Sequence, residues 1–201
     1  MAYMIDTHCH LVDDEFKSDV DEVIERAKIY HVKQAVVCPE YVSQFDAVMN
    51  LRRRHPDFVL AAIGIHPIQV SSRFDLHNLI PLDCFRTVHS RAAAMDTIEF
   101  LKWNNANRVV LHAFNGSKEE ALCGLQAGFF FSIPPSFTSG NHKRFLANVV
   151  PLNHLLLETD SPVLGLVRDE RNEPANLRFP AEFIAEVSPC NFITKNDLSC
   201  L

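Results

Sequence analysis

The chain has 201 residues, of which 47% are hydrophobic and 22% are charged, and these values are typical of a soluble globular protein. This length fits one domain that can bury a sizeable core. The formal charge of −6 argues against a broad basic surface that coats nucleic acid, but not against an enzyme that grips phosphates through metal ions.

Cysteine usage and the N-terminus indicate the compartment. The six cysteines form no C-x-x-C pair and have no regular spacing, which is typical of buried thiols in a reducing environment. Asp6 precedes any apolar run, so no secretory signal is expected, and no apolar stretch approaches the ~20 residues of a membrane span. We expect a cytoplasmic protein, with the nucleus as an alternative, and no membrane partner. The sequence does not indicate an oligomeric state.

The first predicted element is a strand over Met4–His10. Side chains alternate along a strand, so Asp6, His8 and His10 lie on one face. Two imidazoles placed in this way can bind one divalent metal ion. The alternative is a pair of polar side chains at the wet rim of a sheet.

Helices and strands then alternate along the chain. Apolar residues at helical spacing predict helices after Ser18 or Asp19 and over Ser43–His55, Ala92–Asn104, Ser117–Gly128, Asn141–Val149 and Pro180–Val187. Short apolar runs predict strands over Lys33–Cys38, Phe58–His66, Phe85–His89, Arg108–Phe114, Phe129–Ile133 and His154–Thr159. Ser117 and Glu120 form a capping-box pattern. Between His66 and Phe85 the alternation falters, and only a short helix over Arg73–Ile80 is indicated.

This alternation predicts parallel βαβ units. Candidate ligands follow nearly every strand, and a TIM-like barrel builds its active site at that end of its strands. An open three-layer sheet is the alternative, but its sites gather at one switch point. We therefore predict an α/β fold of the TIM-like barrel type. Seven strands are predicted where a closed barrel has eight, so one strand and its helix are expected to be missing.

Five motifs in this order resemble the TatD-type metal-dependent deoxyribonucleases, with the animal TatD DNase domain-containing proteins as the nearest likeness. They are Asp6-Thr7-His8-Cys9-His10, Gly64-Ile65-His66-Pro67, Val88-His89-Ser90-Arg91, Leu111-His112-Ala113-Phe114-Asn115-Gly116 and Glu158-Thr159-Asp160-Ser161-Pro162. Arg171-Asn172-Glu173-Pro174 resembles the loop after the last barrel strand of that family. The resemblance covers residues 4–187.

The resemblance also implies what this chain lacks. The family has a glutamate in an Ile-Gly-Glu-x-Gly-Leu-Asp segment on the strand after Gly-Ile-His-Pro, and this sequence has no such segment. We therefore expect a single TatD-like barrel domain over residues 1–190, with a deletion within about 67–84, a truncated C-terminal helix and an irregular tail over 191–201. The chain resembles a shortened form of a longer protein.

By resemblance, the chain is a metal-dependent hydrolase that cleaves phosphodiester bonds of DNA. The implied ligands are His8, His10 and Asp160 for one divalent ion, and His89 and His112 for a second. The implied metal is Zn²⁺, Mn²⁺ or Mg²⁺, ideally two ions, with the second site weakened because the bridging glutamate is missing. Asp160 is the implied catalytic residue, which orients or deprotonates water. The candidate substrate-binding residues are His66, Arg91, Asn172 and Glu173.

Several alternatives stay open. His112 alone would suit a hydrogen-bonded core histidine, Asp160 a turn cap, and Glu158 a structural acid. Glu40 is the acid best placed to replace the missing glutamate. The chain could also be a catalytically impaired or inactive truncated form, or a related small-molecule amidohydrolase built on the same barrel.

Overall fold

A computed structural model describes residues 3–64, 86–139 and 144–187. Its strands are β1 (Met4–Cys9), β2 (Val32–Val37), β3 (Val59–Ala61), β4 (Arg86–His89), β5 (Val109–His112), β6 (Phe130–Ile133) and β7 (Leu155–Leu157). Its α-helices are α1 (Val20–Ile29), α2 (Phe45–Arg54), α3 (Ala94–Trp103), α4 (Lys118–Gln126), α5 (Arg144–Val149) and α6 (Arg178–Val187).

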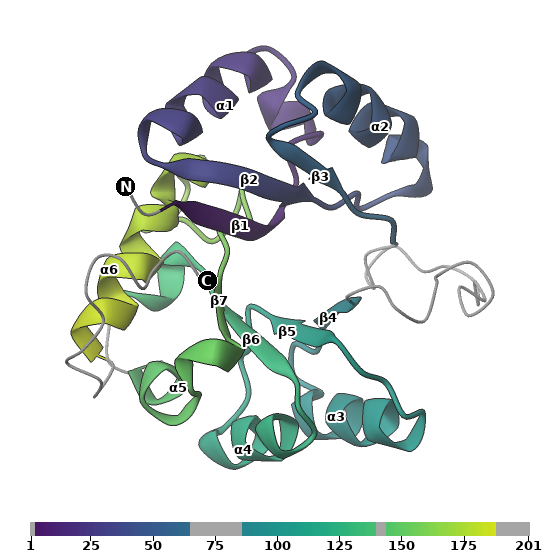
Figure 1. Ribbon diagram of the computed structural model, residues 1–201, viewed down its shortest axis with the longest axis vertical. Helices are drawn as coiled ribbons and strands as arrows, with labels where there is room; N and C mark the ends of the chain where they lie inside the picture. Colours follow the sequence, from purple (N-terminus) through teal and green to yellow (C-terminus); the bar gives the residue numbers. More distant parts are fainter. Residues whose placement is uncertain (1–2, 65–85, 140–143, 188–201) are drawn as a thin grey trace.

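All strand pairs are parallel, in the orders β1-β2-β3 and β4-β5-β6-β7. The two sheets meet where β7 lies beside β1. There the amide of Asp160 donates to the carbonyl of His8 at 2.9 Å, and the amide of His10 donates to the carbonyl of Ser161 at 2.8 Å. The helices lie outside the strands (Figure 1). This is the predicted α/β, TIM-like arrangement, and it brings the ends of β1 and β7 together.

The chain between β3 and β4 includes residues 65–85, which lie outside the described residues. His66, the expected deletion within 67–84, the short helix over Arg73–Ile80 and Phe85 therefore belong to the part not described. The same holds for the tail over 191–201. Seven strands are found in the described part of the chain, as the sequence predicts.

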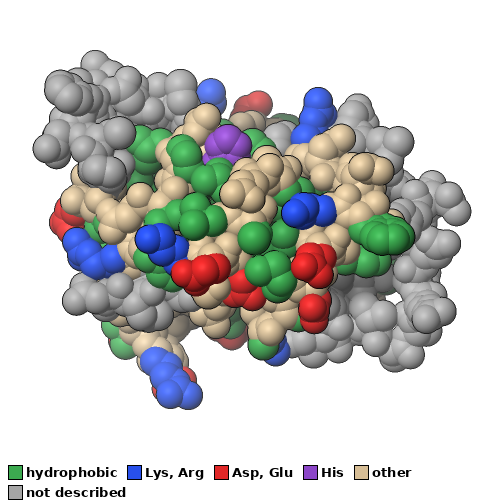
Figure 2. All heavy atoms as spheres, turned by 90° about the horizontal axis from the view of Figure 1, so that it is seen from below, with side chains coloured by type: hydrophobic (Ala, Val, Ile, Leu, Met, Phe, Trp, Pro, Cys, Tyr) green, Lys and Arg blue, Asp and Glu red, His purple; other side chains and the backbone are tan. Residues whose placement is uncertain are grey.

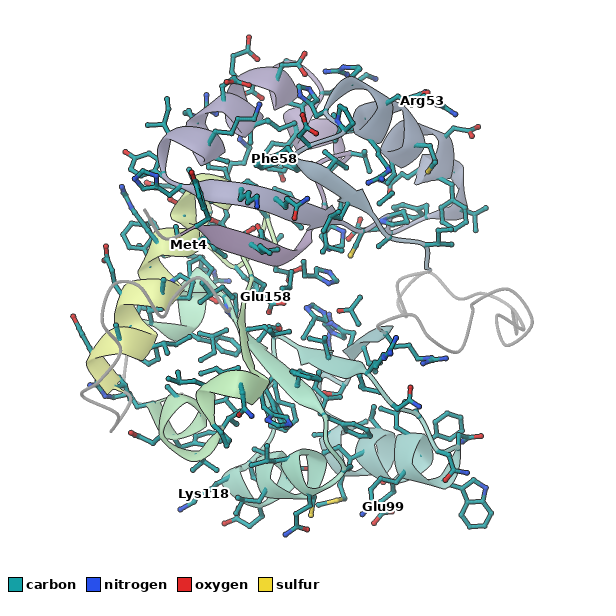
Figure 3. The ribbon with its side chains drawn as sticks, in the orientation of Figure 1. Met4, Arg53, Phe58, Glu99, Lys118 and Glu158 are labelled. Carbon is teal, nitrogen blue, oxygen red and sulfur yellow. The ribbon has the colours of Figure 1, made fainter. Side chains whose placement is uncertain are left out.

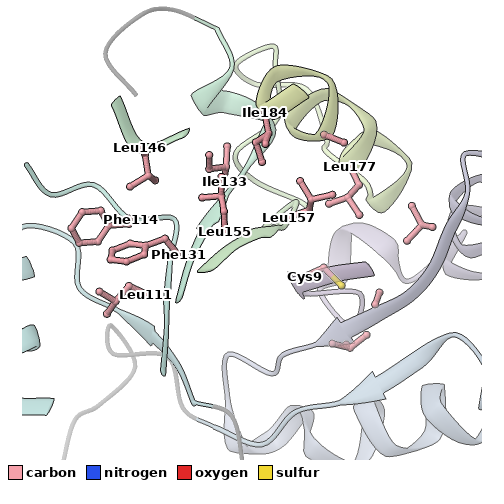
Figure 4. Close-up of a cluster of buried hydrophobic side chains, with 14 of the residues drawn as sticks. Cys9, Leu111, Phe114, Phe131, Ile133, Leu146, Leu155, Leu157, Leu177 and Ile184 are labelled. Carbon is pink, nitrogen blue, oxygen red and sulfur yellow. The ribbon is translucent and has the colours of Figure 1, made fainter. Parts of the chain in front are cut away.

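The core lies between the strands and the helices around them (Figure 4). Phe114 and Phe131 pack edge to face, with ring centroids 5.0 Å apart. Leu155 and Leu157 of β7 are buried, as are Leu111 on β5 and residues of α6. Apolar side chains on both faces of these short strands are what a parallel sheet covered by helices requires.

The capping box predicted at the start of α4 is confirmed. The Oγ of Ser117 accepts a hydrogen bond from the amide of Glu120 at 3.2 Å, and Oε2 of Glu120 accepts one from the amide of Ser117 at 2.6 Å. Helix starts are less well predicted elsewhere. The helix expected to begin at Pro180 begins at Arg178, and the one expected from Ser43 begins with a 3₁₀ turn over Val42–Gln44.

The face that carries α3 and α4 mixes hydrophobic, acidic and basic side chains (Figure 2). On α3, Phe100 and Trp103 are well exposed. Within the described ranges, no helix combines the length and the apolar character needed to cross a membrane.

Candidate metal centre

Three ligand-type side chains meet where β1 and β7 end. His8 and His10 leave one face of β1 and its end, and Asp160 follows β7; all three are buried. Oδ1 of Asp160 lies 3.5 Å from Nε2 of His8 and 3.3 Å from Nε2 of His10, and the two Nε2 atoms are 3.2 Å apart. The structure thus brings together the three residues that the resemblance assigns to one metal ion.

The spacing of these atoms fits a metal site. Ligand atoms about 2.0–2.1 Å from a tetrahedral ion lie roughly 3.3–3.4 Å from one another. The three distances between His8, His10 and Asp160 lie close to this value. Two imidazole nitrogens and a carboxylate oxygen are also a donor set that Zn²⁺ accepts.

The ring of His10 is oriented for ligation. Its Nδ1 lies 2.8 Å from the carbonyl oxygen of Cys38, which can only accept a hydrogen bond. The neutral ring therefore carries its proton on Nδ1 and presents an unprotonated Nε2 to the cluster. Burial lowers the pKa of His10, but the Asp160 carboxylate more than offsets this, so its pKa is raised overall. Nδ1 of His8 lies 3.1 Å from Oγ1 of Thr87.

Asp6 shares the face of His8 but serves the backbone around the site. Its Oδ1 accepts hydrogen bonds from the amides of His8 at 3.2 Å and Thr159 at 3.0 Å, and its Oδ2 accepts one from the Thr159 hydroxyl at 2.5 Å. Burial raises the pKa of Asp6 to about 7 although these bonds oppose the shift. Asp6 therefore links β1 to the segment that carries Asp160. The sequence pattern placed it on the ligand face but did not reveal this role.

Asn172 holds the loop of Asp160 in place. Its Nδ2 donates to the carbonyls of Thr159 and Val163, both at 2.8 Å, and its Oδ1 accepts from Asn176 Nδ2 and the Glu173 amide, both at 2.9 Å. Asp160 needs such support because its φ of 53° is left-handed, a region that most residues avoid. Asn172 was predicted to bind substrate. Its buried amide is instead used in full within the loop.

Replacing Asn172 by alanine is expected to lower the free energy of unfolding by about 2–4 kcal/mol, because four buried polar groups lose their partners at once. Urea denaturation measures this loss. Asn153→Ala, at an exposed asparagine, is the matched control and should change stability by less than about 0.5 kcal/mol. Equal stability of the two variants would contradict this role for Asn172.

His89 and His112 form a pair beside the first cluster. His89 Nδ1 lies 2.8 Å from His112 Nε2, and the ring of His112 stacks on that of His8 with centroids 4.0 Å apart. Arg91 Nε, which can only donate, lies 3.3 Å from His89 Nε2. The neutral His89 ring therefore carries its proton on Nδ1 and donates it to His112. Two nitrogens bound to one ion at about 2.1 Å lie roughly 3.0 Å apart or more, so this pair is closer than a shared metal allows.

Glu158 orients His112 and lies between the two sheets (Figure 3). Its Oε1 accepts a hydrogen bond from the amide of Ala113, and its Oε2 accepts one from Ser132 Oγ, both at 2.7 Å. Oε2 also lies 3.5 Å from Nδ1 of His112. Burial lowers the pKa of His112, but the charge of Glu158 more than compensates, so its pKa is raised. The structural alternative considered for Glu158 thus fits its contacts.

The other candidates are distributed as follows. Arg91 is exposed beside His89 and can reach a substrate. Glu173 forms a bidentate ion pair with Arg26 of α1, with the shortest N–O distance at 2.7 Å, so its carboxylate is already used. Glu40 belongs to neither cluster of possible ligands found among the described residues, which are His8/His10/Asp160 and His8/His112/Glu158.

The family model described as TatD related DNase matches this chain over residues 5–83 and 80–194. The chain belongs to the TatD family. The human deoxyribonuclease TATDN3 is 33% identical to it over 239 residues, covering 92% of this chain and 87% of the relative. The "uncharacterized metal-dependent hydrolase YabD" of Bacillus subtilis (strain 168) is 29% identical over 237 residues, covering 94% of this chain and 92% of the relative.

The fold of this TatD family member is also that of solved TatD structures. The structure of YJJV, a TatD homolog from Escherichia coli K12, matches with a TM-score of 0.83 at 23% identity and covers 98% of this chain and 93% of the other. A TatD family hydrolase from Entamoeba histolytica matches with a TM-score of 0.80 at 17% identity, covering 93% of this chain and 92% of the other. These matches confirm the barrel prediction.

The alignments also bear on length. The alignment with human TATDN3 extends over 239 residues, whereas this TatD chain has 201, so the relative contains residues without a counterpart here. The family model matches in two segments that meet at residues 80–83. Both findings agree with a TatD chain shorter than its relatives.

Proposed function

We propose that this chain is a metal-dependent hydrolase of phosphodiester bonds in DNA. The observation that carries the proposal is the buried cluster of His8, His10 and Asp160, whose ligand atoms are spaced as around one metal ion. The names of its relatives, a deoxyribonuclease and a metal-dependent hydrolase, support the same reading.

We propose one metal ion per chain. His8, His10 and Asp160 would hold it, whereas His89 and His112 are bonded to each other and both oxygens of Glu158 accept hydrogen bonds from protein donors. Imidazole and carboxylate ligands suit Zn²⁺ or Mn²⁺ better than Mg²⁺, which prefers oxygen ligands. When bound, such an ion supplies the positive charge that stabilises the charge developing on a phosphodiester during hydrolysis.

The chain's own residues complete the site. Asp160 has a second carboxylate oxygen that can accept a proton from the attacking water, as a general base at hydrogen-bond distance does. Arg91 is an exposed guanidinium beside the cluster, and guanidinium groups bind phosphate oxygens with two parallel hydrogen bonds. We propose that Arg91 binds a substrate phosphate. We also propose that the chain is a shortened form that lacks the strand bearing the family's glutamate.

The proposal is tested with purified protein and end-labelled single-stranded DNA. Cleavage is expected with Zn²⁺ or Mn²⁺ present, complete loss after chelation, and recovery when one of these ions is restored. The control is the same protein after heat denaturation. Folded protein that retains a metal ion and cleaves no DNA with any of the three candidate ions would refute the proposal.

A further inference from the structure

A groove of about 840 Å³ opens between the segment after β1 and helix α2, and it adjoins the metal centre. Leu11, on its wall, directly follows the ligand His10. Glu40, also on its wall, lies two residues after Cys38, whose carbonyl oxygen orients His10. A molecule in this groove is therefore next to whatever occupies the His8/His10/Asp160 cluster.

The groove has an apolar floor and an aromatic rim. Leu11, Phe16 and Leu51 line it and are almost completely buried. Tyr41 lines the same groove and is 43% exposed, so part of its ring faces solvent. An exposed aromatic ring beside an apolar floor suits a flat, largely apolar ligand, and nucleobases stack on such rings in many proteins that bind single strands.

The charges of the groove disfavour a phosphate. Asp13, Asp14 and Glu40 line it against Lys17 and Arg54, and Arg54 already pairs with Asp21. A phosphodiester placed here would meet more negative than positive charge. A neutral base would not be repelled, and carboxylates can accept hydrogen bonds from the amino groups of bases. The chemistry of the groove therefore separates the base from the backbone.

We propose that this groove binds a nucleobase of single-stranded DNA next to the bond that is cleaved, with Tyr41 stacking on the base. The inference rests on the proposed function, because it takes DNA as the substrate. It assigns the phosphate to the metal centre and the base to the groove. Tyr41 then determines how tightly a strand is held, whereas the ligands determine whether it is cut.

The test measures equilibrium binding of the metal-loaded protein to a fluorescent, cleavage-resistant phosphorothioate oligodeoxynucleotide. A series of such strands carries one abasic nucleotide at each position in turn. Tyr41→Ala is expected to weaken binding of the intact strand on the order of 10-fold. One abasic position should weaken wild-type binding by a similar factor and have little further effect in Tyr41→Ala, because both changes remove the same contact.

Three further variants sharpen the result. Tyr41→Phe keeps the ring and should bind like wild type, whereas Tyr41→Leu keeps apolar bulk and should bind like Tyr41→Ala. Tyr3→Ala, at a tyrosine 51% exposed at the opposite end of β1, is the matched control and should not change binding. Intact-strand binding by Tyr41→Leu equal to wild type, or no binding by wild type at all, would overturn the inference. Binding that follows this pattern without cleavage of ordinary DNA would overturn only the proposed function.

Discussion

Replacing His8 and His10 together by alanine is expected to reduce chelator-sensitive DNA cleavage by about 10³-fold or more. The two imidazoles provide two of the three clustered ligand atoms, and Asp160 alone would hold a divalent ion only weakly. Removing either His8 or His10 should already cost most of the rate, since residues that act as one unit are not additive. Initial rates on labelled single-stranded DNA, with saturating metal, measure the effect.

The matched control for this prediction is His154→Ala. His154 precedes β7, whereas Asp160 follows it, and its ring stacks on Phe130 rather than on the cluster. This variant should retain nearly the wild-type rate. Circular dichroism confirms that each variant is folded. Unchanged cleavage by the folded double variant would show that the activity does not depend on this centre.

The meeting of His8, His10 and Asp160 could be predicted because parallel strands direct their carboxyl ends to one side of a sheet. A period of two along β1 puts both histidines on one face, and a carboxylate just after β7 then reaches the same end. The capping box of α4 was predictable for a similar reason, since Ser117 and Glu120 interact within one helical turn.

The role of Asn172 could not be read from the sequence in this way. It depends on how the loop after β7 folds back so that one amide reaches the carbonyls of Thr159 and Val163. The state of His89 and His112 is equally hidden. Whether two imidazoles share a metal ion or a hydrogen bond depends on a few tenths of an ångström and on the donor, Arg91, that fixes the tautomer.

The number of bound ions follows from that pair. We expect about one metal ion per chain after extensive gel filtration at neutral pH, measured by elemental analysis. His89 and His112 are neutral ligands, and neutral ligands alone bind a hard dication poorly and lose it further as imidazole protonates. Their nitrogens are 2.8 Å apart and hydrogen-bonded, so an ion would first have to break this bond. The nearest carboxylate, Glu158, already accepts hydrogen bonds from Ala113 and Ser132.

Two variants separate the sites in the same measurement. Asp160→Asn removes the only charged ligand of the first cluster, so the retained metal should fall toward zero. His89→Ala should leave the count near one, because His89 contributes to the hydrogen-bonded pair and not to the cluster of His8, His10 and Asp160. Two ions retained by the wild type, with one lost in His89→Ala, would mean that another acid such as Glu40 completes a second site. The chain would then have replaced the carboxylate that its shortened sequence lacks.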